Sequence, residues 1–127
     1  MALTYSIHHA DRLVVAVVEG AFVRRDVERC LADIFAAGCG TYAKLFDIVR
    51  ATNPLQGDDM RALGERIRIL GAMGPMGPLA IVTSNTLRSM AEAYASHATA
   101  PRSIRLFDGE QAARDWLATQ RGSPSER

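Results

Sequence analysis

The sequence predicts an α/β protein with a mostly parallel five-stranded sheet and the element order β-β-α-β-α-β-α-β-α. Two observations carry this prediction. Short runs of β-branched and apolar residues alternate with longer segments whose apolar residues recur every three to four positions. The chain has 127 residues, of which 48% are hydrophobic, which suits one domain with one core. Repeated strand-helix-strand steps favour parallel strands joined by right-handed crossovers.

The N-terminal part of the chain predicts a β-hairpin followed by a helix. Residues 3–8 alternate loosely, residues 12–18 form a β-branched run, and His9-Ala10-Asp11 between them is short enough for a turn. The continuous apolar character of the second strand predicts cover on both of its faces. The next segment has helical spacing, and Gly38 is expected to end that helix. Its apolar stripe consists of Val27, Cys30, Leu31, Ile34 and Phe35.

The rest of the chain predicts three more strands, each followed by a helix. The strands are Leu45–Val49, Leu79–Thr83 and Ile104–Phe107, and the first two helices cover 58–70 and 86–98. The last helix follows Asp108, which forms a capping-box pattern with Gln111. Residues 1–120 are therefore predicted to form one domain, and 121–127 a flexible tail.

The composition excludes several classes of function. The 15 basic and 14 acidic residues give a net charge of +1, which does not attract nucleic acid. No apolar run is long enough to span a bilayer, and the N-terminus has no secretory signal pattern, so no stable membrane insertion is expected. Two cysteines do not make a disulfide framework. These features predict a soluble cytoplasmic protein.

Three segments carry a resemblance to a known family. They are Tyr5–Val18 with Glu19-Gly20, the strand Lys44–Val49, and Ser103–Leu117. Together with the element order, they resemble the SpoIIAA-like fold of STAS domains and of small bacterial STAS/SEC14-type proteins. The resemblance covers about residues 3–119. It implies a two-layer sandwich in which the N-terminal strand is an antiparallel edge strand.

The resemblance also implies a regulatory function without catalysis. Anti-sigma-factor antagonists of this family bind a kinase-like partner at the start of the helix after the central strand, where a serine or threonine is phosphorylated. Here the matching positions are Gln56-Gly57-Asp58-Asp59, which contain no hydroxyl, and Thr52 lies several residues too early. Phosphorylation at this helix start is therefore not expected. Asp58 and Asp59 also favour the helix dipole, which by itself explains acidic residues at this place.

Polar residues follow several of the predicted strands. Carboxyl ends of parallel strands meet at one edge of a sheet, where open α/β sheets bind ligands and partners. We therefore expect the binding residues of this chain at that edge. They are Asp47, Thr52, Asn53, Asp58, Asp59, Arg61, Ser84 and Asn85.

Other patterns do not amount to a catalytic or metal site. Asp47 and Thr83 lie where receiver domains carry a phosphorylated aspartate and a hydroxyl, but the first strands offer no acidic pair for Mg²⁺ and the last strand brings no lysine. Asp47 is expected instead to bond the backbone at a strand end. His8 and His9 are adjacent on a strand or turn and point to opposite faces, so they do not share a metal. We expect no catalytic residue, metal or cofactor.

The two cysteines and the third histidine are also expected to be structural. The separation of Cys30 and Cys39 fits neither a zinc knuckle nor a redox pair, and both thiols are expected to be buried or inert. His97 has no acidic partner near it in the sequence.

Two functions remain open. The leading hypothesis is a non-enzymatic interaction module that docks a protein partner through residues 53–61, or that self-associates. The alternative is a carrier of a small apolar ligand, such as an acyl chain, held between helices 58–70 and 86–98. In the alternative, the segment Gly71–Pro78, with Met73 and Met76, acts as an adaptable lid rather than as a plain connector.

Overall fold

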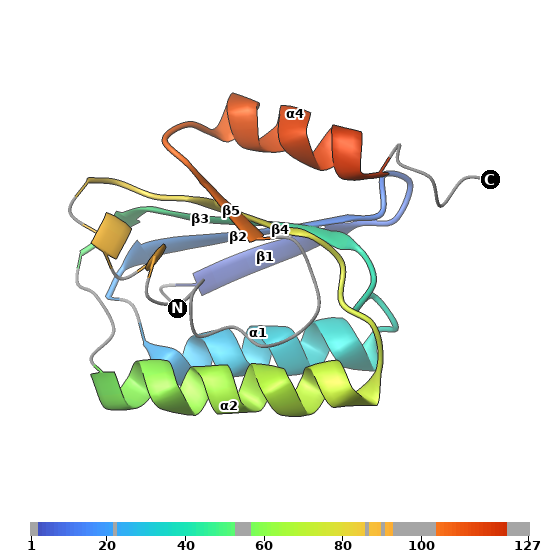
Figure 1. The fold of residues 1–127 in the computed structure, drawn as a ribbon, viewed down its shortest axis with the longest axis horizontal. Helices are drawn as coiled ribbons and strands as arrows, with labels where there is room; N and C mark the ends of the chain where they lie inside the picture. The colour runs from blue at the N-terminus through green and yellow to red at the C-terminus, as the bar shows by residue number, and fades with distance from the viewer. Residues whose placement is uncertain are drawn as a thin grey trace.

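The structure is a computed structural model, and it describes residues 3–21, 23–52, 57–85, 87–89, 91–92 and 104–121. Its centre is one five-stranded sheet in the order β1-β2-β3-β4-β5 (Figure 1). β1 pairs with β2 in antiparallel orientation, and the other three pairs are parallel, as predicted. The strands are β1 (Leu3–His8), β2 (Leu13–Gly20), β3 (Ala43–Ala51), β4 (Leu79–Val82) and β5 (Ile104–Phe107).

Helices cover both faces of this sheet. α1 (Arg24–Ala36) and α2 (Gly57–Met73) lie side by side on one face, and α4 (Glu110–Arg121) lies on the other (Figure 1). The expected two layers therefore become three, because α4 packs against β3, β4 and β5 from the opposite side. The apolar run of the second strand predicts cover on both of its faces, but the cover is complete only on the α1/α2 side, because Leu13, Val15 and Val17 on the other face are half-buried. No described helix is long and apolar enough to cross a membrane.

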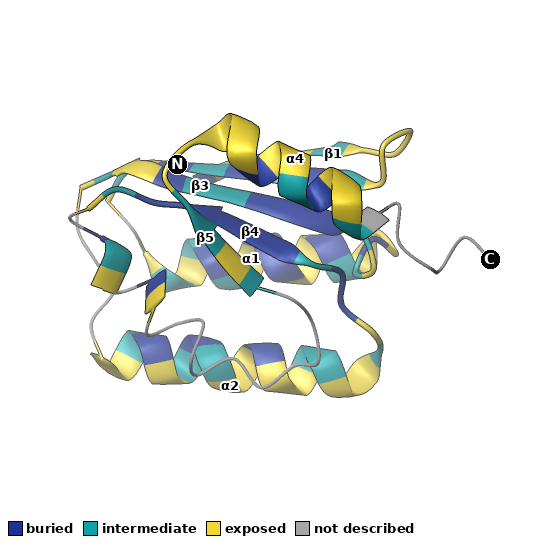
Figure 2. Cartoon of the chain, turned by 45° about the horizontal axis from the view of Figure 1, so that its top comes forward, coloured by how far each residue is buried: buried dark blue, intermediate teal, exposed yellow. Residues whose placement is uncertain are grey.

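The larger core lies between the sheet and the α1/α2 pair. In β2, Val14, Ala16 and Val18 are buried and belong to this core, while the residues between them are only half-buried. The helices place their buried residues on the sides that face the sheet (Figure 2). The apolar stripe of α1 is buried against the same side, as its helical spacing predicts. From α2 the core receives Met60, Leu63 and Ile67.

The smaller core lies under α4 and contains mostly small side chains. Its buried members are Ala43, Leu45, Ala80, Val82, Ala113 and Leu117. The residue Lys44 lies between two of them in β3 and points to the opposite side. Its buried ammonium group donates hydrogen bonds to the carbonyls of Gly40 and Tyr42, at 2.6 and 2.9 Å.

Several element ends differ from the prediction. β3 runs from Ala43 to Ala51 and so extends past both ends of the predicted strand. α2 continues to Met73 through Gly71, because a glycine weakens a helix but does not by itself end it. α1 does end before Gly38, whose φ of 77° is a conformation that glycine adopts easily. α4 ends at Arg121, the first residue of the predicted tail. The other tail residues, 122–127, lie outside the described residues.

The start of α4 differs from the predicted capping box. The carbonyl of Gly109 accepts the first helical hydrogen bond, from the amide of Ala113 at 3.4 Å. Asp108 is instead ion-paired with Arg88, and Gln111 donates to Asp115 at 2.9 Å. The partner that Asp108 takes comes from a distant segment, which sequence spacing does not reveal.

The predicted helix 86–98 falls largely outside the described residues. Within them, Leu87 and Ala91 are buried, and the amide of Ala91 donates to the carbonyl of Leu87 at 3.0 Å. This is the spacing of one helical turn. His97 and Asn53 also lie outside the described residues.

Candidate functional site

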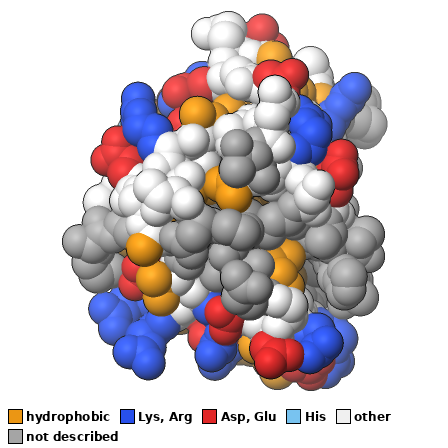
Figure 3. Space-filling model, turned by 90° about the vertical axis from the view of Figure 1, so that its left-hand side faces the viewer, with side chains coloured by type: hydrophobic (Ala, Val, Ile, Leu, Met, Phe, Trp, Pro, Cys, Tyr) orange, Lys and Arg blue, Asp and Glu red, His pale blue; other side chains and the backbone are white. Residues whose placement is uncertain are grey.

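The carboxyl ends of the parallel strands bring several predicted site residues to one edge of the sheet, which we call the carboxyl edge. Thr52 follows β3, and its amide donates to the carbonyl of Gly20 at the end of β2, at 2.8 Å. Ser84 and Asn85 follow β4 at the same edge. Figure 3 views the molecule from this side and shows charged side chains of both signs around its rim. Thr52, Ser84 and Asn85 thus follow strands that end at the same edge of the sheet.

The start of α2 adds two acidic residues that have different surroundings. The carboxylate of Asp59 accepts a hydrogen bond from Arg24 Nε of α1 at 3.0 Å. Arg24 also donates to Glu28 at 2.9 Å, and these two carboxylates raise the pKa of its guanidinium group, with the hydrogen bond to Asp59 contributing most. Asp59 therefore ties the start of α2 to α1.

Asp58 instead faces solvent. Its side chain is 92% exposed and forms an ion pair with Arg61, which is 73% exposed and lies one turn further along α2. Exposed pairs of this kind contribute little to folding stability. The Asp58–Arg61 pair is thus available for contact with another molecule at little cost to the fold.

Asp47 lies level with Val82, the last residue of β4, and not at the end of its own strand. It is inside β3, opposite Val17 and Val82, four residues before the strand ends. Its carboxylate accepts a hydrogen bond from the amide of Val49 at 3.0 Å. It bonds the backbone, as expected, but within the strand instead of at its end.

The connection after β4 is held to the last strand by two contacts. The amide of Thr83 donates to the carbonyl of Phe107 at 3.0 Å, and Arg88 pairs with Asp108. The buried hydroxyl of Thr83 donates to the carbonyl of Ser84 at 3.2 Å. This hydroxyl is therefore committed to the local backbone.

The histidines and cysteines of the described chain are placed away from this edge. His9 Nδ1 and the Tyr42 hydroxyl share a hydrogen bond of 2.8 Å, and His8 Nε2 lies 3.0 Å from the Ser6 hydroxyl. Both cysteines are buried, and burial raises the pKa of the Cys30 thiol to about 11. Among the described residues, no group of three His, Cys, Asp or Glu side chains is arranged to hold a metal ion.

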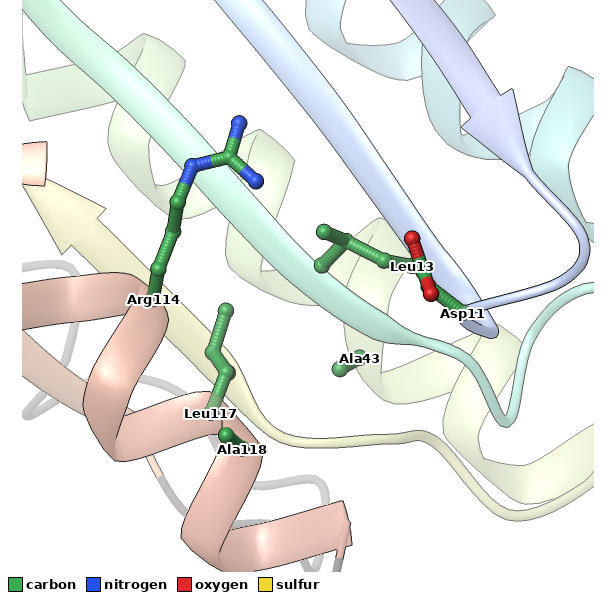
Figure 4. Close-up of a pocket in the computed structure, with 6 residues that line it drawn as sticks. All are labelled: Asp11, Leu13, Ala43, Arg114, Leu117 and Ala118. Carbon is green, nitrogen blue, oxygen red and sulfur yellow. The ribbon is translucent and has the colours of Figure 1, made fainter. Parts of the chain in front are cut away.

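Among the described residues, two hollows lie at the end of the molecule opposite the carboxyl edge. The larger, of about 490 Å³, lies between the C-terminal ends of α1 and α2, and we call it the α1/α2 groove. Its lining residues are largely apolar: Ala32, Phe35, Ala36, Gly38, Gly40, Thr41, Leu70, Met73, Gly74 and Pro75. The smaller, of about 190 Å³, lies under α4, with Arg114 and Leu117 of α4 on one side and Asp11 and Leu13 on the other (Figure 4).

The segment Gly71–Pro78 passes beside the α1/α2 groove and is partly fixed. The amide of Gly77 donates to the carbonyl of Gly40 at 3.0 Å, and a Cβ atom at Gly77 would lie 2.2 Å from the carbonyl oxygen of Tyr42. Met76 is buried, whereas Met73 is 74% exposed. The second half of this segment is therefore a connector, and its first half borders the groove.

Sequence reasoning missed the α1/α2 groove because its two walls are far apart in the chain. The available signals were the Gly38-Cys39-Gly40 turn and the run of methionines, glycines and prolines in 71–78. Each indicates an irregular backbone, but neither shows that the two segments face one another.

No protein-family model and no curated protein matches this sequence. Among solved structures, the chain is similar to an uncharacterized protein of the DUF3478 family with a SpoIIAA-like fold, from Shewanella loihica PV-4. The two share 17% sequence identity, the similarity covers 91% of this chain and 93% of the other, and the TM-score is 0.60. The fold of this chain is therefore SpoIIAA-like, as the three resembling segments imply.

Proposed function

We propose that this chain is a non-enzymatic interaction module that docks a protein partner through the carboxyl edge, at the start of α2. The observation that carries the proposal is the contrast between Asp58 and Asp59. One carboxylate fixes the helix start to α1 through Arg24, while its neighbour is almost fully exposed beside Arg61. A rigid support with accessible charge favours recognition of a partner with complementary charge.

A backbone hydrogen bond fixes the end of β3 at the same edge. The amide of Thr52 donates to the carbonyl of Gly20 of β2 at 2.8 Å, whereas the neighbouring Arg50–Glu19 pair is exposed and adds little. The residues Gly57 to Arg61 contain no hydroxyl. Recognition here would therefore rest on carboxylate and guanidinium groups, and it would not be switched by phosphorylation of the helix start.

A charge-exchange experiment tests the proposed docking surface. The double variant Asp58→Arg/Arg61→Asp keeps the number of charges but reverses their positions. The matched control is Glu65→Arg/Arg68→Glu, because Glu65 and Arg68 form the same kind of exposed pair three positions apart on the same helix. Each tagged variant is purified gently from its own host, and the polypeptides retained are quantified by native mass spectrometry.

The expected result is loss of a retained polypeptide in the Asp58/Arg61 variant and its retention in the control. Equal retention in both variants would contradict docking at this helix start. Circular dichroism of both variants checks that α2 still forms, since a cation in the first turn opposes the helix dipole.

The α1/α2 groove favours a second candidate, a carrier of a small apolar ligand. Its volume of about 490 Å³ is within the range of small-molecule sites, and Met73 supplies an adaptable apolar side chain at its border. This groove lies between α1 and α2, whereas the site expected between helices 58–70 and 86–98 falls largely outside the described residues. A small molecule that appears in the native mass spectrum, and that is released on denaturation, would support the carrier.

A further inference from the structure

β1 forms one edge of the sheet, because among the described residues it pairs with β2 alone. Its six residues follow β2 without a register shift. They include no Lys, Arg, Asp, Glu or Pro, although charges, prolines and bulges are the features that protect sheet edges from pairing with another chain. The opposite edge strand, β5, is shorter and carries Arg105. The two edges of the sheet are thus protected to different degrees.

The sequence of β1 is self-complementary about Tyr5. Read in either direction, residues 3–7 are apolar, hydroxyl-bearing, aromatic, hydroxyl-bearing and apolar. Antiparallel pairing of two copies centred on Tyr5 therefore places Tyr5 opposite Tyr5 of the second copy. Thr4 then lies opposite Ser6 of the second copy, and Leu3 opposite Ile7 of the second copy. Matched cross-strand pairs of this kind stabilise antiparallel sheets.

The two faces of β1 also agree with this pairing. Residues 3, 5 and 7 share one face, and Leu3 and Ile7 both pack in the core on the α1/α2 side. The Tyr5 hydroxyl donates to Asp33 of α1 at 3.0 Å, so the ring lies on this side too, and Tyr5 is still 38% exposed. Thr4 and Ser6 lie on the other face and are exposed. Pairing would extend each face with residues of the same kind.

We propose that a second copy of this chain pairs with β1, in antiparallel orientation about a two-fold axis at Tyr5. The two five-stranded sheets then become one continuous sheet. A segment of a different protein is a poorer fit, because only a second copy is certain to match each residue in this order. This interface is separate from the carboxyl edge, so it does not depend on the proposed docking function.

Charge placed on the edge strand tests both the interface and its register. In Thr4→Lys/Ser6→Lys, each introduced lysine faces an introduced lysine of the second copy. In the matched variant Thr4→Lys/Ser6→Glu, each lysine faces a glutamate. Both variants change the same two exposed positions, and the tag is placed at the C-terminus, away from β1. Sedimentation equilibrium over a concentration series gives the mass of each.

The expected result is a dimer for the unmodified chain, a twofold lower mass for the lysine/lysine variant, and a dimer again for the lysine/glutamate variant. A monomer for the unmodified chain throughout the series overturns the proposal. A dimer in all three chains places the interface elsewhere and also overturns it. Failure of the lysine/glutamate variant to restore the dimer overturns the register.

Disulfide trapping gives a second measurement that does not depend on repulsion. Only a residue on the two-fold axis faces its own copy, so Tyr5→Cys is expected to form a covalent dimer under mild oxidation. Ser6→Cys is the control: its two copies are offset by two residues, roughly 7 Å along the strands in addition to the strand spacing, which is too far for a disulfide. The native cysteines are buried and give little background. Equal cross-linking of both variants would contradict the axis at Tyr5.

Discussion

The two faces of the sheet are held by different kinds of packing. On the α1/α2 side, aliphatic side chains from two helices and from the strands form a large continuous core. On the α4 side, half of the buried residues are alanines, and one helix closes the layer. The first face gains stability from buried apolar area, and the second depends on the close approach of small residues. The same sheet therefore responds differently to substitution on its two sides.

The largest effect is expected on the α1/α2 side. Ile67 of α2 is fully buried in its core, so Ile67→Ala removes packed methyl groups and leaves a cavity. We expect it to lower the free energy of unfolding by about 3–5 kcal/mol. The control is Ile69→Ala, two residues along the same helix, where the side chain is 47% exposed. Urea unfolding of both variants measures the difference, and equal losses would contradict the placement of this core.

A pH series tests how well the same side excludes water at Cys30. Its thiol keeps its proton in the folded chain up to a pKa of about 11, against 9.0 for the ordinary group. Between these values the unfolded chain has lost the proton and the folded chain has not, so the stability from this group is complete below about pH 9 and falls as pH rises to about 11. We expect this loss to amount to about 2–3 kcal/mol.

The comparison with Cys30→Ala isolates this loss from other groups that titrate at high pH. The unmodified chain should lose stability more steeply than the variant between these two pH values. Parallel curves would show that the thiol titrates normally in the folded chain and that water reaches it.

The α4 side is expected to be sensitive to added volume. Ala113 of α4 is fully buried against the sheet, in the cluster that contains Ala80 and Val82. Ala113→Leu would push α4 away from the sheet, at a cost of about 1–3 kcal/mol. Ala112→Leu is the matched control, because that neighbouring alanine is exposed. Thermal unfolding of the two variants measures the difference, and equal midpoints would contradict a closely packed layer.

Local sequence patterns predicted most of the fold because they report on periodicity. The apolar stripe of α1 at helical spacing and the β-branched run of β2 both lie where expected. The glycine at 38 ends its helix through a backbone conformation that depends on that residue alone. Differences arose at element ends, such as Asp108, where a distant partner decides which local contact is made.

Local patterns also predicted where part of the candidate site lies. The sheet order follows from repeated strand-helix steps, and it brings Thr52, Ser84 and Asn85 to one edge. The different surroundings of Asp58 and Asp59 did not follow from the sequence, because they depend on where Arg24 of α1 reaches α2. Asp47 was expected at a strand end, but pairing with β2 extends β3 beyond it.

The sequence by itself determined the element order, the strand directions and the self-complementary pattern of β1, since each follows from residue types at fixed spacing. Only the tertiary structure decided that α4 forms a third layer, that Arg24 holds Asp59, and that an open groove lies between the ends of α1 and α2. These features depend on distances between segments far apart in the chain. Such distances are set by how the two cores pack and not by any local pattern.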